Sequence, residues 1–188
     1  MAEILLFHHA QGLTPGVLSF ADELRAAGHP VHTPDLYDGH TFDDLDEGVA
    51  YGQSLGMEEI VDRGRRAAES LPDEIVYGGF SFGVLPAQML AQTRPGAKGA
   101  LLFHDCIAPS EFGTAWPAAV PLQVHTMEED PWVDLGTARE VVRAADGAEL
   151  YVYPGHGHLF ADEGSRDYDA GAAPLLKQRV LEFLAALD

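Results

Sequence analysis

EIVYGGFSFG, residues 74–83, is the stretch of sequence that decides the fold. Its apolar beginning predicts a buried strand, and the residues after Gly83 predict a helix. Between the two, Gly79-x-Ser81-x-Gly83 has the spacing of a nucleophile elbow, a tight turn that holds a serine hydroxyl above the sheet. Side chains at the two glycine positions would collide with the neighbouring strand and helix. The pattern therefore predicts that Ser81 is a nucleophile at a helix N-terminus; the alternative is a glycine-rich turn with an incidental serine.

Strands and helices alternate along the whole chain. Apolar runs predict strands at 3–9, 30–33, 74–79, 98–104, 121–126 and 149–153. Apolar residues at helical spacing predict helices at 16–27, 42–55, 57–70, 83–93, 135–145 and 173–187. This alternation implies an α/β fold with a mostly parallel central sheet and helices on both faces. No repeat, linker or composition break divides the sequence, so we expect one domain over residues 1–188.

Polar residues follow three of the predicted strands. The carboxyl ends of parallel strands meet at one edge of a sheet, and ligands bind there. Ser81 comes after the strand of the quoted stretch, and Asp130 and His158 come after the last two predicted strands. This Ser–Asp–His order is the one that α/β-hydrolases use, so we predict that the three form a catalytic triad. Spacing leaves other members open, namely His156 as the base and Glu128, Glu129 or Asp134 as the acid.

Each member of the predicted triad has a chemical task. His158 would take the hydroxyl proton of Ser81 during attack, and Asp130 would accept a hydrogen bond from the other ring nitrogen. The backbone N–H groups of Phe82 and Ala10 are the predicted oxyanion hole. Donors of this kind are worth about 3 kcal/mol each in transition-state stabilisation.

Histidines also gather at the ends of predicted strands, where imidazole could bind zinc. They are His8, His9, His104, His156 and His158. No His-Glu-x-x-His pattern or cysteine pair accompanies them, so we expect no metal and no cofactor.

Composition and charge limit the classes of partner. The 188 residues are 46% hydrophobic, and their 30 acidic and 11 basic residues give a formal net charge of −19. Such a charge repels nucleic acid and anionic membrane surfaces, so we expect neither as a partner. The N-terminus lacks the features of a signal peptide, and the single cysteine, Cys106, fits a reducing compartment; we expect a cytoplasmic protein. Nothing in the sequence indicates an oligomeric state.

Six segments spread over the chain match one known family. They are FHHAQGL at 7–13, TPDLY at 33–37, GFSFG at 79–83, DPWV at 130–133, YPGHGHLF at 153–160 and the stretch 168–184. Over nearly its whole length the chain resembles the dienelactone hydrolases, small α/β-hydrolases without a lid domain. In the family's Tyr-Pro-Gly-x-x-His-x-Phe pattern the catalytic histidine falls on His158, and the family's acid falls on Asp130.

The chain also departs from that family in ways that bear on the substrate. Founding members use a cysteine where this chain has Ser81, and a glutamate where it has His9. Two arginines hold their substrate's carboxylate, but this chain has no arginine between Arg25 and Arg63, and Asp162 stands at the second arginine's position. A carboxylate in the cleft would repel an anionic substrate, so the resemblance implies a neutral or cationic ester instead.

The expected substrate is a small molecule in an open pocket. We expect the lining to include His9, Gln11, Phe80, Trp116, Trp132 and Leu159. The predicted function is a serine hydrolase that cleaves a small carboxylic ester or lactone through an acyl-enzyme intermediate. The alternatives are a thioesterase and an α/β-hydrolase-fold module that binds a ligand without turnover.

Overall fold

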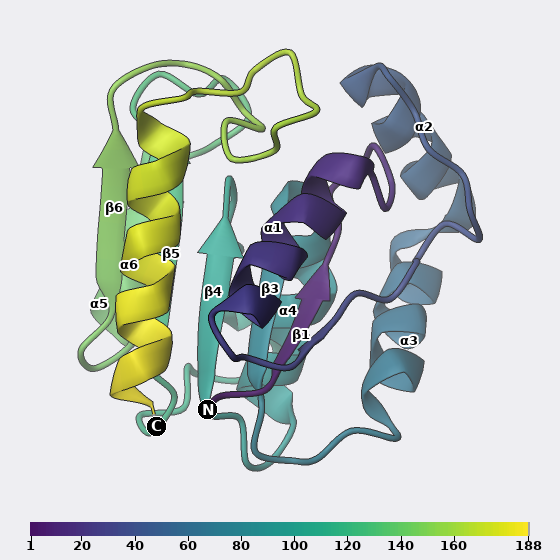
Figure 1. Cartoon of the computed structure of the whole chain (residues 1–188). Helices are drawn as coiled ribbons and strands as arrows, with labels where there is room; N and C mark the ends of the chain where they lie inside the picture. Colours follow the sequence, from purple (N-terminus) through teal and green to yellow (C-terminus); the bar gives the residue numbers. More distant parts are fainter. Residues whose placement is uncertain (188) are drawn as a thin grey trace.

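The computed structural model describes residues 1–187, and it contains one six-stranded parallel sheet with helices on both faces (Figure 1). The strand order is β2-β1-β3-β4-β5-β6, and each neighbouring pair runs parallel. The strands are β1 (Ile4–Phe7), β2 (Val31–His32), β3 (Val76–Phe80), β4 (Gly99–Phe103), β5 (Leu122–Met127) and β6 (Glu149–Tyr153). The predicted domain also includes residue 188, which lies outside the described residues.

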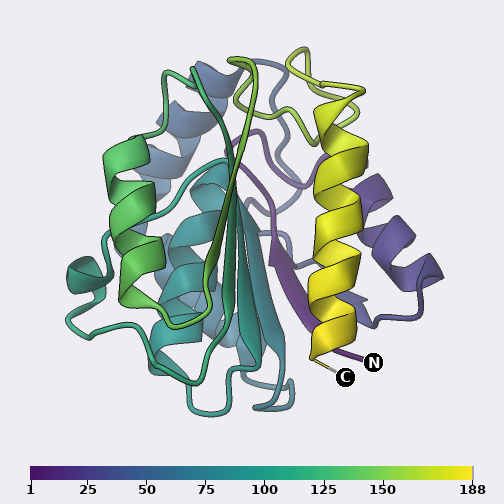
Figure 2. The same cartoon turned by 90° about the vertical axis from the view of Figure 1, so that its left-hand side faces the viewer.

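Helices cover the sheet in two layers, which Figure 2 shows with the sheet seen on edge. One face is covered by α1 (Pro15–Ala26) and α6 (Ala172–Ala186). The other face is covered by α3 (Met57–Ala68), α4 (Val84–Thr93) and α5 (Leu135–Ala144). The remaining helix, α2 (Leu45–Leu55), lies beside the carboxyl end of the sheet, and no lid domain is present among residues 1–187 (Figure 1).

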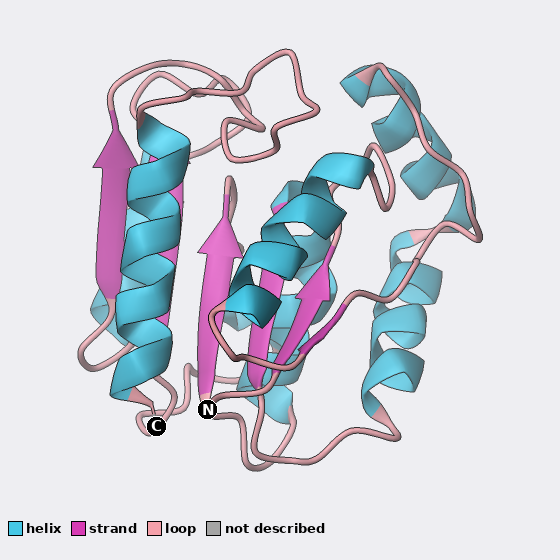
Figure 3. Cartoon of the chain, viewed as in Figure 1, coloured by secondary structure: helices cyan, strands magenta, loops and turns pink. Residues whose placement is uncertain are grey.

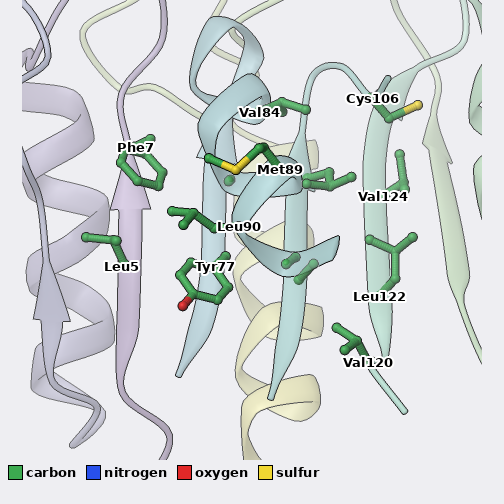
Figure 4. Close-up of a cluster of buried hydrophobic side chains, with 14 of the residues drawn as sticks. Leu5, Phe7, Tyr77, Val84, Met89, Leu90, Cys106, Val120, Leu122 and Val124 are labelled. Carbon is green, nitrogen blue, oxygen red and sulfur yellow. The ribbon is translucent and has the colours of Figure 1, made fainter. Parts of the chain in front are cut away.

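Two apolar clusters, one on each face of the sheet, form the core. Successive side chains of a strand point to opposite faces, so Leu5 and Phe7 of β1 join one cluster while Ile4 and Leu6 join the other. Figure 4 shows the first cluster, in which Tyr77 of β3 and Val84, Met89 and Leu90 of α4 lie on the same face of the sheet. Each fully buried leucine or phenylalanine contributes about 1.5 to 3 kcal/mol, which explains why the strands read as continuous apolar runs.

The strands end at a common edge. Register pairs Phe80 with Phe103, Phe103 with His125, and Met127 with Tyr153, so the ends of β3 to β6 lie near one another. In Figure 3 the strand arrows point toward the top of the view, so the carboxyl ends of the strands share one side of the sheet. The polar residues after the strands are therefore brought to one rim, as expected for a parallel sheet.

The predicted fold class is confirmed, and the predicted elements differ from the observed ones mainly at their ends. The helix expected from residue 42 begins at Leu45, because the Asp44 side chain caps it by accepting the N–H of Glu47. The strand expected at 30–33 is reduced to two residues at the sheet edge. Two short 3₁₀ turns, Ser81–Gly83 and Pro109–Phe112, were not predicted. None of the helices in residues 1–187 has the length and hydropathy required to span a membrane.

Candidate active site

Ser81 lies on the sharp turn between β3 and α4, in the left-handed region with φ of 48°. Such a conformation costs a non-glycine residue about 1 to 3 kcal/mol, so the surrounding structure must hold it. A Cβ on Gly79 would lie 2.2 Å from the carbonyl oxygen of Gly83, and a Cβ on Gly83 would lie 2.5 Å from that of His8. Only glycine fits at these two positions, and the turn has the geometry of a nucleophile elbow.

Three side chains from three loops form a hydrogen-bonded relay. Ser81 Oγ lies 2.7 Å from Nε2 of His158, and Nδ1 of His158 lies 2.7 Å from Oδ2 of Asp130. His158 is 4% exposed and Asp130 is 7% exposed, whereas Ser81 is partly exposed to solvent. Because the Nδ1–H of His158 donates to Asp130, Nε2 offers its lone pair to the hydroxyl of Ser81. The arrangement can therefore take a proton from Ser81.

The loop after β5 fixes the acid of this relay. The second carboxylate oxygen of Asp130 accepts the backbone N–H of Trp132 at 2.9 Å, which holds the side chain in a tight turn. The other acids considered for this role are all exposed, and they are Glu128, Glu129 and Asp134. Asp134 instead caps α5 through the N–H of Gly136. Asp130 is thus the carboxylate that the structure brings to the imidazole ring of His158.

The loop after β6 fixes the base. The backbone N–H of His158 donates to the carboxylate of Asp167 at 3.2 Å, and a Cβ on Gly157 would lie 2.7 Å from the carbonyl oxygen of Asp167. His156, the other histidine considered as the base, is exposed. Asp167 was not predicted, because a single aspartate in a long loop gives no signal in the sequence.

The two predicted oxyanion-hole residues lie where helix α2 packs against the sheet. Ala10 is fully buried in the loop after β1, and Phe82 is the residue directly after Ser81. A Cβ on Gly48 would lie 2.2 Å from the carbonyl oxygen of Ala10, and a Cβ on Gly52 would lie 2.6 Å from the ring of Phe82. Helix α2 therefore approaches both residues closely through its two buried glycines.

A hollow of about 160 Å³ lies beside His158. Its wall includes Gln11, Leu159 and Trp132, whose ring centre lies 5.7 Å from that of His158. A second hollow of about 520 Å³ shares Gln11 with the first. Three of the predicted pocket residues, Gln11, Trp132 and Leu159, thus line space next to the relay; Ser81 itself is not part of either wall.

Three other predicted pocket residues lie elsewhere, so the expectation for them is corrected. Phe80 is 1% exposed and packs in the core against Phe103 at 4.7 Å between ring centres. Trp116 is 5% exposed, and its indole N–H donates to the carbonyl of Val120. His9 is fully buried and faces Asp162. Large apolar rings are more stable in the core than at a wet cleft, so Phe80 and Trp116 are buried although their positions in the sequence suggested a pocket.

Asp162, the acid considered for the cleft, is nearly buried in the wall of the hollow of about 520 Å³. Its side chain is 2% exposed and accepts hydrogen bonds from His9 Nε2 at 2.6 Å and from the Thr14 hydroxyl at 2.8 Å. Although burial alone would raise the pKa of Asp162, these hydrogen bonds together lower it. The carboxylate is therefore held by groups of the protein, and only its small exposed part borders the hollow.

Two groups after β4, the buried His104 and the half-buried Asp105, are not part of the predicted triad. His104 has a φ of 69°, and neither of its ring nitrogens has a hydrogen-bond partner among residues 1–187. Its ring centre lies 6.1 Å from that of His158 and 4.7 Å from that of Phe160. Burial lowers the pKa of His104 well below its usual value, so the ring is neutral. For Asp105, burial together with the charge of Asp130 raises the pKa to about 6.

The raised pKa of Asp105 predicts a dependence of stability on pH. In the unfolded chain this carboxyl titrates near 3.8, so between about pH 4 and 6 the folded protein binds the proton that the unfolded chain has lost. The free energy of unfolding should therefore fall as the pH rises through this window. We expect Asp105→Asn to be the more stable form above pH 6 by about 2 kcal/mol, with no gain below pH 4. Its amide oxygen can still accept the N–H of Cys106. Urea unfolding at pH 4 and pH 7 measures the difference, and an equal gain at both would contradict it.

The buried histidines that follow β1 each have a hydrogen-bond partner of their own. His8 accepts the N–H of Leu36, and His9 pairs with Asp162. Within residues 1–187, no group of three or more His, Cys, Asp or Glu side chains is arranged to hold a metal ion.

Comparisons with known proteins agree with the fold. A model of the dienelactone hydrolase family matches residues 2–187. No curated protein matches the sequence significantly. Among solved structures, a dienelactone hydrolase-like promiscuous phosphotriesterase from metagenomic libraries has a TM-score of 0.79 at 21% identity, with 100% of this chain and 87% of that chain covered.

Two further structures are similar at low identity. The dienelactone hydrolase from Anabaena variabilis has a TM-score of 0.69 at 17% identity, with 99% of this chain and 86% of that chain covered. A metagenome-derived lipolytic enzyme of the LipS and LipT pair has a TM-score of 0.67 at 16% identity, with 98% and 94% covered. At such identities these likenesses concern the fold alone.

Proposed function

Because this chain belongs to the dienelactone hydrolase family and is therefore a hydrolase, we propose that it cleaves a small carboxylic ester or lactone with Ser81 as the nucleophile. The observation that carries the proposal is the continuous relay from Ser81 Oγ through His158 to Asp130, with 2.7 Å at each step. A serine hydroxyl is a weak nucleophile at neutral pH, and this relay is the arrangement that activates it.

The reaction follows from the positions of these atoms. Ser81 Oγ attacks the carbonyl carbon of the ester, and its proton moves to Nε2 of His158. The imidazolium is stabilised by the carboxylate of Asp130. When the tetrahedral intermediate collapses, the bond to the leaving alcohol breaks and His158 returns the proton to that alcohol's oxygen. Water, deprotonated by His158, then hydrolyses the acyl-enzyme and frees Ser81.

The negative charge of the tetrahedral intermediate needs donors, and two backbone N–H groups are suited to the task. Phe82 directly follows the nucleophile, and Ala10 lies in the loop after β1. The N–H of Ala10 donates no hydrogen bond to any of residues 1–187, so it is available to a ligand. Such preorganised donors act more strongly in a water-poor site than in bulk water.

The hollow beside His158 favours substrates without negative charge. Its wall includes four aspartates and one arginine, and these are Asp43, Asp44, Asp46, Asp167 and Arg166. Like charges repel across a cleft, and the half-exposed ring of Trp132 can pack on an apolar or cationic group. We therefore propose a neutral or cationic ester as the substrate, because acidic residues predominate in the wall of this hollow.

A fluorophosphonate probe tests the assignment of the nucleophile. The folded wild-type protein should gain the mass of the phosphonyl group on the peptide that contains Ser81, whereas Ser81→Ala should gain none. Wild-type protein unfolded in urea is the control, because the unfolded chain lacks the relay and should not react. Labelling at another residue contradicts the role of Ser81, and no labelling of folded protein favours a binding module. Short-chain acyl esters, lactones and thioesters then identify the acyl class.

A further inference from the structure

One buried hydrogen-bonded pair of side chains outside the proposed triad joins two loops of the site. His9 belongs to the loop after β1, and Asp162 belongs to the loop after β6. Their side chains are 0% and 2% exposed, and His9 Nε2 lies 2.6 Å from Asp162 Oδ2. The two residues are 153 positions apart in sequence, so this contact links distant parts of the chain.

The hydrogen bonds of His9 define its orientation. The backbone N–H of Gln11 donates to Nδ1 of His9 at 3.2 Å, so Nδ1 carries a lone pair and the ring proton sits on Nε2. The Nε2–H therefore donates to the carboxylate of Asp162. Ala10, whose N–H is a proposed oxyanion donor, lies in the chain between His9 and Gln11, and Gln11 is bonded to this imidazole.

Asp162 is fixed by further contacts on its own side. Its Oδ2 also accepts the hydroxyl of Thr14 at 2.8 Å, and its Oδ1 accepts the N–H of Gly164 at 2.6 Å. Thr14 caps the N-terminus of α1, and a Cβ on Gly16 would lie 1.6 Å from Oδ1 of Asp162. The carboxylate thus fills a site that only glycine leaves open, at the positive end of a helix.

Asp162 is also rigidly connected to the base. It lies four residues after His158, and its N–H donates to the carbonyl of Leu159, within the turn that follows His158. We propose that His9 and Asp162 act as a positioning pair that fixes the Ala10 N–H relative to His158. This inference rests on the proposed function, since it assigns the pair to the alignment of the oxyanion donor with the catalytic base.

Two conservative variants of His9 separate this role from general stability. His9→Gln keeps a donor that reaches Asp162 and loses the acceptor for Gln11. His9→Asn keeps an acceptor for Gln11 but is too short to reach Asp162. The measured quantity is the maximal rate of inactivation by the fluorophosphonate, separated from the probe's half-saturating concentration. We expect His9→Asn to lose about 10²-fold in maximal rate, the scale for a misplaced catalytic group, and His9→Gln to lose only a few-fold. The half-saturating concentration should stay unchanged for both.

Controls distinguish the possible failures. His29→Ala removes another buried imidazole, bonded to the carbonyl of Ala2 at the opposite end of the sheet, and should leave the maximal rate unchanged. Asp162→Ala removes the acceptor from the other side and should reproduce the loss seen in His9→Asn, which keeps the test open if that variant does not fold. Equal rates for folded His9→Asn and His9→Gln would overturn the positioning pair while leaving the nucleophile intact. A wild-type protein that does not react would instead contradict the proposed function.

Discussion

Replacing His158 by alanine is expected to lower kcat/KM for the best ester substrate by about 10⁴-fold or more, on the scale of triad deletions in serine hydrolases. Among residues 1–187 the imidazole is the one group within hydrogen-bond distance of the Ser81 hydroxyl, since Nε2 lies 2.7 Å from Oγ. Without it the hydroxyl must attack in its protonated form, and no acid is left to protonate the leaving alcohol. The hollow and the backbone donors remain, so KM should change little. Steady-state kinetics on an activated short-chain ester measures the loss.

Asp130→Asn is the companion variant. The neutral amide cannot stabilise an imidazolium, and if its oxygen keeps the N–H of Trp132, its NH2 group faces Nδ1 of His158 and favours the wrong tautomer. We expect kcat/KM to fall by about 10⁴-fold with an unchanged fold, which is the effect of the wrong histidine tautomer in other triads. His156→Ala is the matched control, because this exposed histidine lies two residues from His158 and should have no effect. If His156→Ala were the inactive variant and His158→Ala were active, the proposed relay would be wrong.

Periodicity and strand ends were sufficient to predict most of the fold. Buried strands such as β3 are continuous apolar runs because both faces are covered, and a run of this kind is visible in any sequence. The ends of elements depend on single contacts instead. The cap of α2 by Asp44 and the shortness of β2 at the sheet edge follow from local hydrogen bonds that periodicity does not encode.

The candidate site was predictable to the extent that it depends on strand ends. Ser81, Asp130 and His158 each follow a parallel strand, so the topology alone brings them to one rim. The direction of a side chain is set by packing, which the sequence does not reveal. Phe80 therefore turned out to be a core residue, and Asp162 an internal hydrogen-bond partner of His9. Asp167 gave no signal because its role depends on a contact within an irregular loop.

The second large prediction concerns a glycine of the nucleophile elbow, Gly83, and the stability of the fold. A Cβ on Gly83 would lie 2.5 Å from the carbonyl oxygen of His8 and 2.6 Å from that of Phe7. These are backbone atoms of strand β1 and the loop after it, and they cannot move without disturbing the pairing of β1 with β3. We expect Gly83→Ala to lower the free energy of unfolding by about 3 kcal/mol, the upper end for overpacked sites, and the melting temperature by about 10 °C.

The same substitution at a roomy position is the control for this expectation. Gly171 precedes α6 with φ of −94°, and a Cβ there would lie 3.3 Å from Oδ1 of Asp169, which accepts the N–H groups of Gly171 and Ala172 and needs to shift only slightly. Gly171→Ala should change the free energy of unfolding by less than about 0.5 kcal/mol. Thermal unfolding followed by circular dichroism compares the two variants with the wild type. Should Gly83→Ala melt within a degree or two of Gly171→Ala, the close approach of β1 to the elbow would not exist, and the strained turn that exposes Ser81 would need another cause.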